Sequence, residues 1–347
     1  MNAPASPLAD RWKALLQEQP KTRIRDAAEQ LNVSEAELLA TELASKVTPL
    51  KADWKDFMEA IAEQAGTVMC LTRNDWVVIE KTGPFEELEF DGPVGVTLGD
   101  YMDFRIFWSQ WNVAYSVITE RPDRVLRSFQ IFDHYGDSVL KIYLKEDSQK
   151  EIFEKLTEQF KDENPQEPVF KEKPAPTRPQ PAPEGFDEAR WQEEWLALED
   201  THDFYPMLRK HRIDRLTSLR HAPEGYAWQL KNDCLETLLN EARDRKLDIM
   251  VFVNSRGNIE IHTGPVHNLK RVGEYMNVLD PEFNLHFKEE GIHEVWVVRK
   301  PTVDGIVTAV EFYQEDGSDI AMFFGRRQPG DPELQEWRDL VNDLPRA

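Results

Sequence analysis

The feature that most constrains the fold of this chain is an internal duplication. Residues 66–144 align without a gap with residues 247–325, at a constant spacing of 181 positions. The alignment superposes Thr82-Gly83-Pro84 on Thr263-Gly264-Pro265, so that the turn-forming residues recur in register. Self-similarity over a run of this length indicates that one folding unit occurs twice. The chain is therefore expected to contain two similar halves.

Both copies carry the pattern of short β-strands joined by tight turns. In the first copy, Thr67–Leu71 and Trp76–Ile79 are rich in β-prone residues and are separated by polar turn residues. Ile249–Val253 and Ile259–Ile261 repeat this arrangement in the second copy. Consecutive strands with short connections pair antiparallel. Apolar residues at helical spacing precede each run of strands, so the sequence predicts an α+β fold with an internal duplication.

A proline-rich stretch separates the two copies. Residues 161–184 contain seven prolines, which block helices and sheet ladders and favour an extended polyproline II linker. Two domains also suit the length of 347 residues, since a domain commonly has roughly 100 to 200 residues. The sequence therefore predicts an N-terminal repeat at 1–160, a linker at 161–185 and a C-terminal repeat at 186–347. A docking segment for a proline-binding partner is the alternative interpretation of this stretch.

Composition limits the classes of partner. The 42 basic and 64 acidic side chains give a net charge of −22, which repels phosphate backbones and anionic lipid headgroups. No apolar run approaches the roughly 20 residues that cross a bilayer, and Met1–Pro20 lacks the pattern of a secretory signal. We therefore expect a cytoplasmic protein with no nucleic-acid partner and no stable membrane association. Cys70 and Cys234 form no CxxC pair, and both are expected to be buried small apolar residues.

One histidine stands out because it continues an apolar helical stripe. The stripe consists of Trp191, Trp195, Leu198, His202 and Tyr205, and Pro206 then kinks or restarts the helix. The corresponding place in the first half, around Trp12, has no histidine. A lone histidine on an apolar face is more often a core residue than a ligand. These residues alone therefore favour a structural role for His202.

A set of segments in the second half resembles one known family. The segments are Asp200–Phe204, Ile249–Val253, Ile261–Pro265, Asn277–Pro281, Phe283–His286, Trp296–Thr302, Asp304–Val307 and Phe324–Gly325 with Arg327. Together with Asp103–Trp108 and the duplication, they are similar to the bacterial cytoplasmic haem-utilisation proteins of the HemS, HmuS and ChuS type, the hemin-degrading factors or hemin transport proteins. The resemblance covers essentially the whole chain. It implies two similar halves, each with a large antiparallel sheet and packed helices, that bind one haem (iron protoporphyrin IX) against the C-terminal half.

The resemblance also implies roles for individual residues. By this resemblance His202 corresponds to the family's axial ligand of the haem iron. Arg215 corresponds to its distal arginine, which would be the catalytic residue if the protein is an enzyme. Phe252 falls on a phenylalanine that contacts the haem, and Lys300 and Arg327 fall on basic residues that meet the propionates or line the pocket. Iron binds imidazole nitrogen readily, and propionates in so acidic a chain need local cations. For Lys300 and Arg327, solvated cations at strand ends are the alternative.

Three further positions fit the pattern of the family less closely. Arg105, whose register partner is His286, belongs either to the haem pocket or to a salt bridge at the rim of the core. Met322 and Phe324 stand where related sequences carry a glutamine and a tyrosine. The chain therefore lacks two polar contacts to the haem edge or to bound water, which alters the distal chemistry but not the expectation of haem.

Two functions follow from the resemblance, and a third from the N-terminus. The favoured one is a carrier, a monomer or dimer that receives haem from an inner-membrane importer and passes it to a separate haem oxygenase. The alternative is an enzyme that opens the porphyrin ring with oxygen and electrons and releases iron. Residues 23–39 also resemble a helix-turn-helix, which would suit a DNA-binding regulator. Glu35 and Glu37 open its second helix, where they would repel phosphates, so a packing role is favoured.

Overall fold

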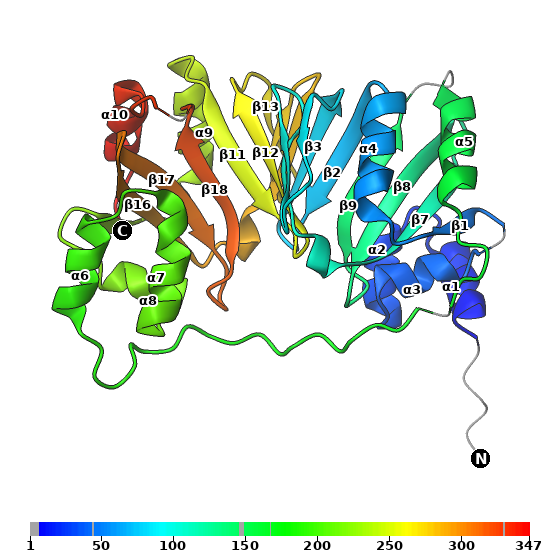
Figure 1. The fold of residues 1–347 in the computed structure, drawn as a ribbon, viewed down its shortest axis with the longest axis horizontal. Helices are drawn as coiled ribbons and strands as arrows, with labels where there is room; N and C mark the ends of the chain where they lie inside the picture. Colours follow the sequence, from blue (N-terminus) through cyan, green and yellow to red (C-terminus); the bar gives the residue numbers. More distant parts are fainter. Residues whose placement is uncertain (1–6, 44, 146–148, 167, 329) are drawn as a thin grey trace. The chain divides into compact units, whose positions relative to one another are not determined.

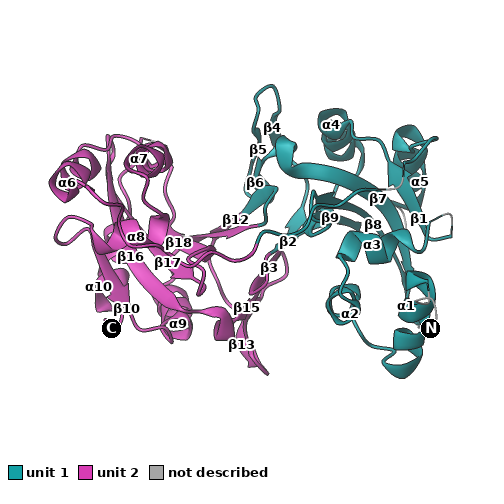
Figure 2. Ribbon diagram, turned by 90° about the horizontal axis from the view of Figure 1, so that it is seen from below, with its two compact units in different colours: residues 1–73, 80–174, 255–260 teal, residues 74–79, 175–254, 261–347 magenta. Residues whose placement is uncertain are grey.

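The computed structural model of the chain describes residues 7–43, 45–145, 149–166, 168–328 and 330–347 (Figure 1). The chain divides into two units, which are coloured separately in Figure 2. Unit 1 consists of Met1–Arg73, Glu80–Pro174 and Ser255–Glu260, and unit 2 consists of Asn74–Ile79, Ala175–Asn254 and Ile261–Ala347. Each unit combines antiparallel strands with helices, so the predicted α+β fold with an internal duplication is confirmed.

The main strands of unit 1 follow the order β1-β7-β8-β9-β2. They are β1 (Val47–Leu50), β7 (Trp111–Glu120), β8 (Val125–Asp133), β9 (Ser138–Leu144) and β2 (Val68–Arg73). Helices α4 (Trp54–Gln64) and α5 (Lys150–Phe160) pack on one face, where Phe57 and Phe153 contact Phe129. Helix α3 (Glu35–Ala40) packs on the other face, and α1 (Leu8–Glu18) and α2 (Ile24–Leu31) pack around it. Two helical layers are possible because successive side chains of a strand point to opposite faces.

Unit 2 repeats this arrangement with the strand order β10-β16-β17-β18-β11. The strands are β10 (Ala227–Leu230), β16 (Glu294–Thr302), β17 (Gly305–Tyr313), β18 (Asp319–Gly325) and β11 (Ile249–Asn254). Helices α9 (Leu235–Asp244) and α10 (Gln335–Asp343) cover one face. Helices α6 (Glu188–Leu196), α7 (Phe204–His211) and α8 (Arg215–Arg220) cover the other, where their tryptophans and Phe204 pack near Trp296 and Tyr313. The face under α6–α8 carries most of the residues considered below.

Eight further strands extend the two sheets. They are β3 (Val77–Gly83), β4 (Glu87–Glu89), β5 (Gly95–Leu98), β6 (Asp103–Ile106), β12 (Asn258–Gly264), β13 (Leu269–Val272), β14 (Tyr275–Leu279) and β15 (Phe283–Lys288), and short 3-10 turns are η1 (Trp108–Gln110), η3 (Thr201–Asp203) and η4 (Glu289–Gly291). The full strand orders are β1-β7-β8-β9-β2-β3-β15-β14-β13 and β10-β16-β17-β18-β11-β12-β6-β5-β4. Each sheet thus takes six strands from one half of the sequence and three from the other. The sequence pattern did not indicate this exchange, because periodicity identifies strands but not their partners.

The proline-rich linker is extended, and both of its ends are bound to the protein. In unit 1, the backbone N–H of Lys171 donates to the carbonyl of His134 at 2.8 Å, in the turn between β8 and β9. In unit 2, the N–H of Gln180 donates to Asp214 Oδ2 at 3.1 Å, and the hydroxyl of Thr217 donates to the carbonyl of Gln180 at 2.8 Å. These bonds make the ends of the linker part of the folded structure of each unit.

The helix-turn-helix segment is a packing element. Helix α3 begins with a capping box on Ser34, and the side chain of Glu35 is buried in an ion pair with Lys141 on β9. The N–H of Ala36 also donates to the carbonyl of Gly136 at 3.1 Å. The first turn of α3 therefore faces the sheet, which fits the packing role favoured by its acidic residues.

Two other expectations concern membranes and cysteines. Within the described residues, no helix has both the length and the apolar character needed to cross a membrane. Cys70 and Cys234 are both free and buried, as the sequence predicted.

A glycine substitution tests whether the linker is docked on unit 2. Gly317 and Gly225 both have positive φ, at +82° and +78°, but only at Gly317 would an added Cβ lie 2.7 Å from Pro179 Cγ. We expect Gly225→Ala to lower the free energy of unfolding by about 1 kcal/mol through backbone strain alone. Gly317→Ala should cost measurably more in urea unfolding, because it must also displace the linker. Equal costs for the two variants would show that the linker leaves this turn in solution.

Candidate functional site

Five of the six residues singled out by the sequence lie in unit 2, and Arg105 lies on β6 in unit 1. His202 is in η3, directly before α7, and Arg215 is the first residue of α8. Phe252 lies on β11, Lys300 lies on β16, and Arg327 follows β18. Phe252, Lys300 and Arg327 thus lie on or directly after strands of the sheet of unit 2. His202 and Arg215 lie in the helical segment that packs on that sheet.

The imidazole of His202 is exposed and oriented by Asp200. The side chain is 90% exposed, which rules out the core role that the apolar stripe favoured. Asp200 Oδ1 accepts a hydrogen bond from the backbone N–H of His202 at 2.8 Å and another from its Nδ1 at 2.7 Å. The bond from the backbone N–H, reinforced by the one from the ring, lowers the pKa of Asp200. An ionised carboxylate only accepts hydrogen bonds, so Nδ1 carries a proton, and in the neutral form of the ring the lone pair is on Nε2.

Arg215 forms a buried ion pair with Glu311 of β17. Arg215 Nη2 lies 2.6 Å from Glu311 Oε1, and Arg215 Nε donates to Glu311 Oε2 at 3.0 Å and to the hydroxyl of Tyr313 at 2.9 Å. Burial alone would raise the pKa of Glu311, but Arg215 and Lys300 hold it at about 2. Among the described residues, Arg215 Nη1 has no hydrogen-bond partner although it is buried. This buried nitrogen therefore carries N–H donors that have no acceptor among the described residues.

Lys300 completes the buried charge cluster. Its ammonium lies 3.6 Å from Glu311 Oε1 and 4.5 Å from the ring centroid of Phe204, and the residue is only 7% exposed. Burial, followed by repulsion from Arg215, lowers the pKa of Lys300 to about 8. The alternative of a solvated cation at a strand end is therefore wrong for Lys300.

Arg327 remains partly exposed beside the segment that carries His202. Its Nη2 lies 3.4 Å from Asp304 Oδ2, in the turn between β16 and β17. The charge of Arg327 also contributes to the lowered pKa of Asp200, after the larger effects of the hydrogen bonds from His202. A long contact at a partly exposed carboxylate can be exchanged for a contact to an anionic ligand.

An aromatic pair and a methionine extend the site across the sheet. The rings of Phe252 and Phe324 are in edge contact, with centroids 4.9 Å apart. Met322 pairs with Phe252 across the strands, and its Sδ lies 3.9 Å from Arg215 Nη2. The two departures from the family pattern thus make this part of the surface more apolar.

Arg105 makes local contacts within unit 1. Its Nη1 bonds to Asp103 Oδ1 at 2.5 Å and donates to the carbonyl of Phe104 at 3.0 Å. These are the contacts of the salt bridge that the sequence offered as one of its two roles.

Sequence reasoning missed three polar residues that organise the site. Glu311 and Tyr313 bind Arg215, and Asp200 binds His202. Glu311 carried a signal, because a carboxylate between Val310 and Phe312 in an apolar strand needs a buried partner. Asp200 lay inside a segment that carried the resemblance, but nothing in the sequence indicated its contact.

The structure extends the duplication into the helices and shows what differs between the halves. Asn32 and Arg212 both end a helix in the left-handed conformation, with φ of 53° and 54°, so the helices repeat at a spacing of 180. At this spacing Glu35 is equivalent to Arg215. At the spacing of 181 that relates the strands, Lys141 is equivalent to Met322. Unit 1 therefore fills the equivalent position with its own ion pair. At the same spacing, Thr22 occupies the place of His202, so only unit 2 combines a histidine with an unsatisfied arginine here.

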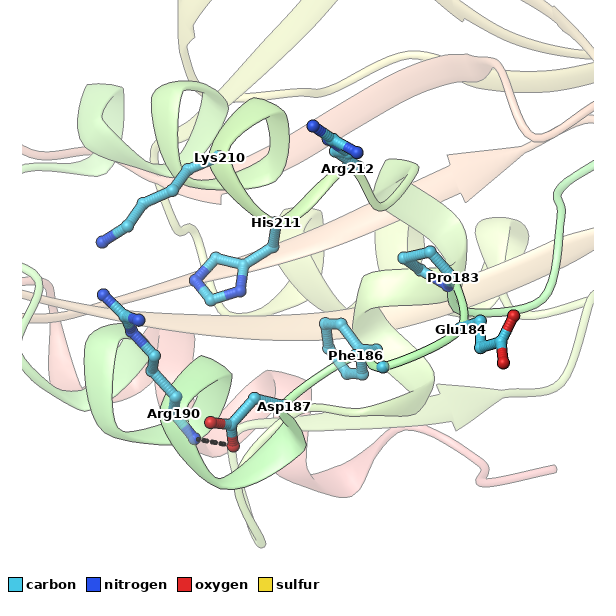
Figure 3. A pocket seen from close by; sticks show the side chains of 9 residues that line it. Pro183, Glu184, Phe186, Asp187, Arg190, Lys210, His211 and Arg212 are labelled. Atoms are coloured by element: carbon cyan, nitrogen blue, oxygen red, sulfur yellow. Dashed lines mark hydrogen bonds between the residues drawn. The ribbon is translucent and has the colours of Figure 1, made fainter.

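A separate pocket of about 260 Å³ lies beside the end of the linker in unit 2 (Figure 3). It is lined by Pro183, Glu184, Gly185, Phe186, Asp187, Arg190, Lys210, His211 and Arg212. None of the six residues identified from the sequence lines it. The pocket also lies below the roughly 300 Å³ at which ligand sites usually begin. His211 contributes its ring, but its Nε2 is bonded to Glu194 at 2.9 Å. We therefore place the candidate site around His202 and Arg215.

Comparisons with known proteins agree over nearly the whole chain. The model of the haemin-degrading HemS/ChuX domain matches residues 32–160 and again residues 212–344. The chain is 34% identical over 328 residues to the hemin transport protein HmuS of Yersinia pestis, covering 94% of both chains. The crystal structure of holo-PhuS, a heme-binding protein from Pseudomonas aeruginosa, is similar with a TM-score of 0.93 and 40% identity, covering 99% of this chain and 100% of that one. ChuS, an E. coli heme oxygenase, is similar with a TM-score of 0.87 and 30% identity, covering 98% and 99%.

The buried lysine gives the site a testable pH dependence. Folding lowers the pKa of Lys300 from 10.5 to about 8, so between these pH values the unfolded chain binds a proton that the folded chain does not. The free energy of unfolding should therefore rise with pH in this window, by at most about 3 kcal/mol from this group. Urea unfolding of the wild type and of Lys300→Met from pH 7 to pH 11 isolates the effect. Parallel curves for the two proteins would mean that Lys300 is solvated.

Proposed function

Because the chain belongs to the haemin-degrading HemS/ChuX family, we propose that it binds one haem in unit 2 and carries it for iron acquisition. The observation that supports this most directly is the exposed imidazole of His202, whose Nδ1 is bonded to Asp200 and whose Nε2 is free. The protein would act in the cytoplasm, as a monomer or dimer. It would receive haem from an inner-membrane importer and deliver it to a haem oxygenase.

The residues around His202 match what haem requires. Nε2 of His202 would bind the iron, and the Phe252–Phe324 pair offers apolar surface to the porphyrin. Arg215 Nη1 would gain the hydrogen-bond partner that it lacks. When bound, haem supplies an iron centre and its redox chemistry, while the protein supplies the ligand, the orientation and the charges.

The two remaining cations would act differently toward the propionates. Arg327 is partly exposed and its contact to Asp304 is long, at 3.4 Å, so it can turn to a propionate at little cost. Lys300 is buried against Glu311, so its main effect would be to hold the ion pair of Arg215 in place. A charge-assisted hydrogen bond from Arg327 would contribute about 1.5 to 3 kcal/mol, less where solvent screens it.

The second candidate function is haem degradation by the same site. It is favoured by the similarity to a heme oxygenase from E. coli, at 30% identity. In that case Arg215 would be the catalytic residue, because its free Nη1 would meet whatever binds at the distal face. Met322 and Phe324 weaken this alternative, since they provide no hydroxyl or amide to order water or oxygen near the haem edge.

One experiment separates the two functions. The protein is loaded with haem anaerobically and then given oxygen and a reductant, with catalase present to remove free peroxide. For a carrier, we expect a persistent Soret band and no stoichiometric carbon monoxide or chelatable iron. Loss of the band with release of carbon monoxide and iron would assign the enzymatic function instead.

Removal of His202 tests the haem site itself. We expect His202→Ala to change the Soret position and to speed haem loss by about tenfold or more, because the iron loses its ligand. The melting temperature of the apo-protein should stay within a few degrees, since the side chain is exposed. The variant is also combined with His211→Ala, so that His211 cannot replace the ligand.

His267→Ala is the matched control, because His267 is an exposed histidine of the same unit. It should bind haem like the wild type. If the His202→Ala/His211→Ala double variant kept the wild-type spectrum and dissociation rate, His202 would not be the ligand.

A further inference from the structure

We propose that Asp200 is a positioning residue that fixes the tautomer and orientation of His202 and strengthens its bond to ferric haem iron. The inference rests on the proposed haem binding and extends the contact between Asp200 and His202, described above, to the properties of the bound iron. Its basis is that one carboxylate oxygen of Asp200 accepts from both the backbone N–H and the ring Nδ1 of the same histidine, at 2.8 and 2.7 Å.

The two bonds constrain the imidazole more than either would alone. The bond from the backbone fixes the carboxylate relative to η3, where Asp200 is the N-cap. The bond from Nδ1 then fixes the ring relative to that carboxylate. The two bonds thus favour one orientation of the ring, in which Nε2, on the far side of the ring from Nδ1, is directed away from Asp200.

The backbone of this segment is itself attached to the sheet. The N–H of Val303, in the turn between β16 and β17, donates to the carbonyl of Glu199 at 3.0 Å. On the other side, the N–H of Asp203 donates to the carbonyl of Asp200 at 3.2 Å. Asp200 is therefore held on both sides, so the orientation of His202 depends on the position of the β16–β17 turn.

A carboxylate on Nδ1 changes the chemistry of the opposite nitrogen. Partial transfer of the Nδ1 proton toward Asp200 gives the ring imidazolate character and makes Nε2 a stronger donor to the metal. A stronger donor stabilises ferric over ferrous iron. Reduction precedes oxygen binding, so this contact favours holding haem intact over opening its ring.

The bond between the side chains should strengthen when haem binds. The imidazole is 90% exposed and the Asp200 side chain 59% exposed, so water competes for both groups. A porphyrin over the imidazole would remove that water and lower the local dielectric constant. The effect of Asp200 should therefore appear in the properties of bound haem rather than in the stability of the apo-protein.

The test compares Asp200→Asn with Asp203→Asn in the full-length protein loaded with hemin. Asparagine caps a helical turn as well as aspartate does, so the first variant removes the charge and keeps the N-cap. Asp203 is exposed on the same turn and has no side-chain capping bond, so its variant makes the same change of charge beside the site. Three properties are measured: the iron–histidine stretching frequency of the ferrous protein, the reduction midpoint and the rate of haem transfer to apomyoglobin.

For Asp200→Asn we expect a lower iron–histidine frequency, a higher reduction midpoint and haem loss about tenfold faster, at the lower end of the effect of such outer contacts. Asp203→Asn should match the wild type in all three. If Asp200→Asn lowers the melting temperature of the apo-protein, Asp200→Ser is measured instead, because serine also caps but carries no charge.

The outcomes separate the inference from the function on which it rests. A wild-type protein that binds no haem, or binds it without a histidine signature, would overturn the proposed function. Wild-type haem ligation by His202 with all three properties unchanged in Asp200→Asn and Asp200→Ser would leave the function standing and overturn the role of Asp200. The same shifts in Asp203→Asn would also overturn it, since they would reflect local charge alone.

Discussion

The buried pairing of Arg215 with Glu311 is the interaction on which the rest of the candidate site depends. A carboxylate in the middle of a covered strand costs several kcal/mol unless opposite charges and hydrogen bonds compensate it. Arg215, Lys300 and the hydroxyl of Tyr313 provide that compensation for Glu311. Because Arg215 opens α8, the same pairing fixes this helix on the sheet. Because the buried Glu311 requires a cation, Arg215 is held on the face of the sheet that also carries the His202 segment. One nitrogen of Arg215, Nη1, has no hydrogen-bond partner among the described residues.

The other half of the duplication also attaches a helix to its sheet through a buried ion pair. Unit 1 has a buried ion pair at the same place, but with its charges reversed: Glu35 is on the helix and Lys141 on the strand. Both versions attach a short helix to a sheet, which is a structural task. What distinguishes unit 2 is the addition of an exposed histidine and the loss of a charged partner at Met322. The candidate site in unit 2 therefore differs at few positions from a packing arrangement that both halves share.

The sequence was informative wherever the signal was local or periodic. The register of the repeat identified the paired architecture, and the apolar stripe with Pro206 located His202 near a helix end. Residue exposure was harder, because the sequence left open whether Lys300 lines a pocket or lies in solvent, and only the structure shows it buried beneath Phe204 of α7. Contacts between residues far apart in the chain could not be predicted. Arg215 and Glu311, for example, are 96 positions apart and meet only in the folded structure. The exchange of strands between the sheets had no sequence signal for the same reason.

The bound linker has a consequence for dissecting the protein. Gln180 is hydrogen-bonded to the Asp214 side chain and to Thr217, which flank Arg215 at the start of α8. A fragment that began at residue 186, where helical periodicity resumes, would leave the N-cap of that helix short of a donor and Thr217 without its acceptor. The stretch that separates the repeats in the sequence therefore packs against the start of the helix that carries Arg215. Limited proteolysis within it would loosen the helix that carries Arg215 rather than simply release two intact halves.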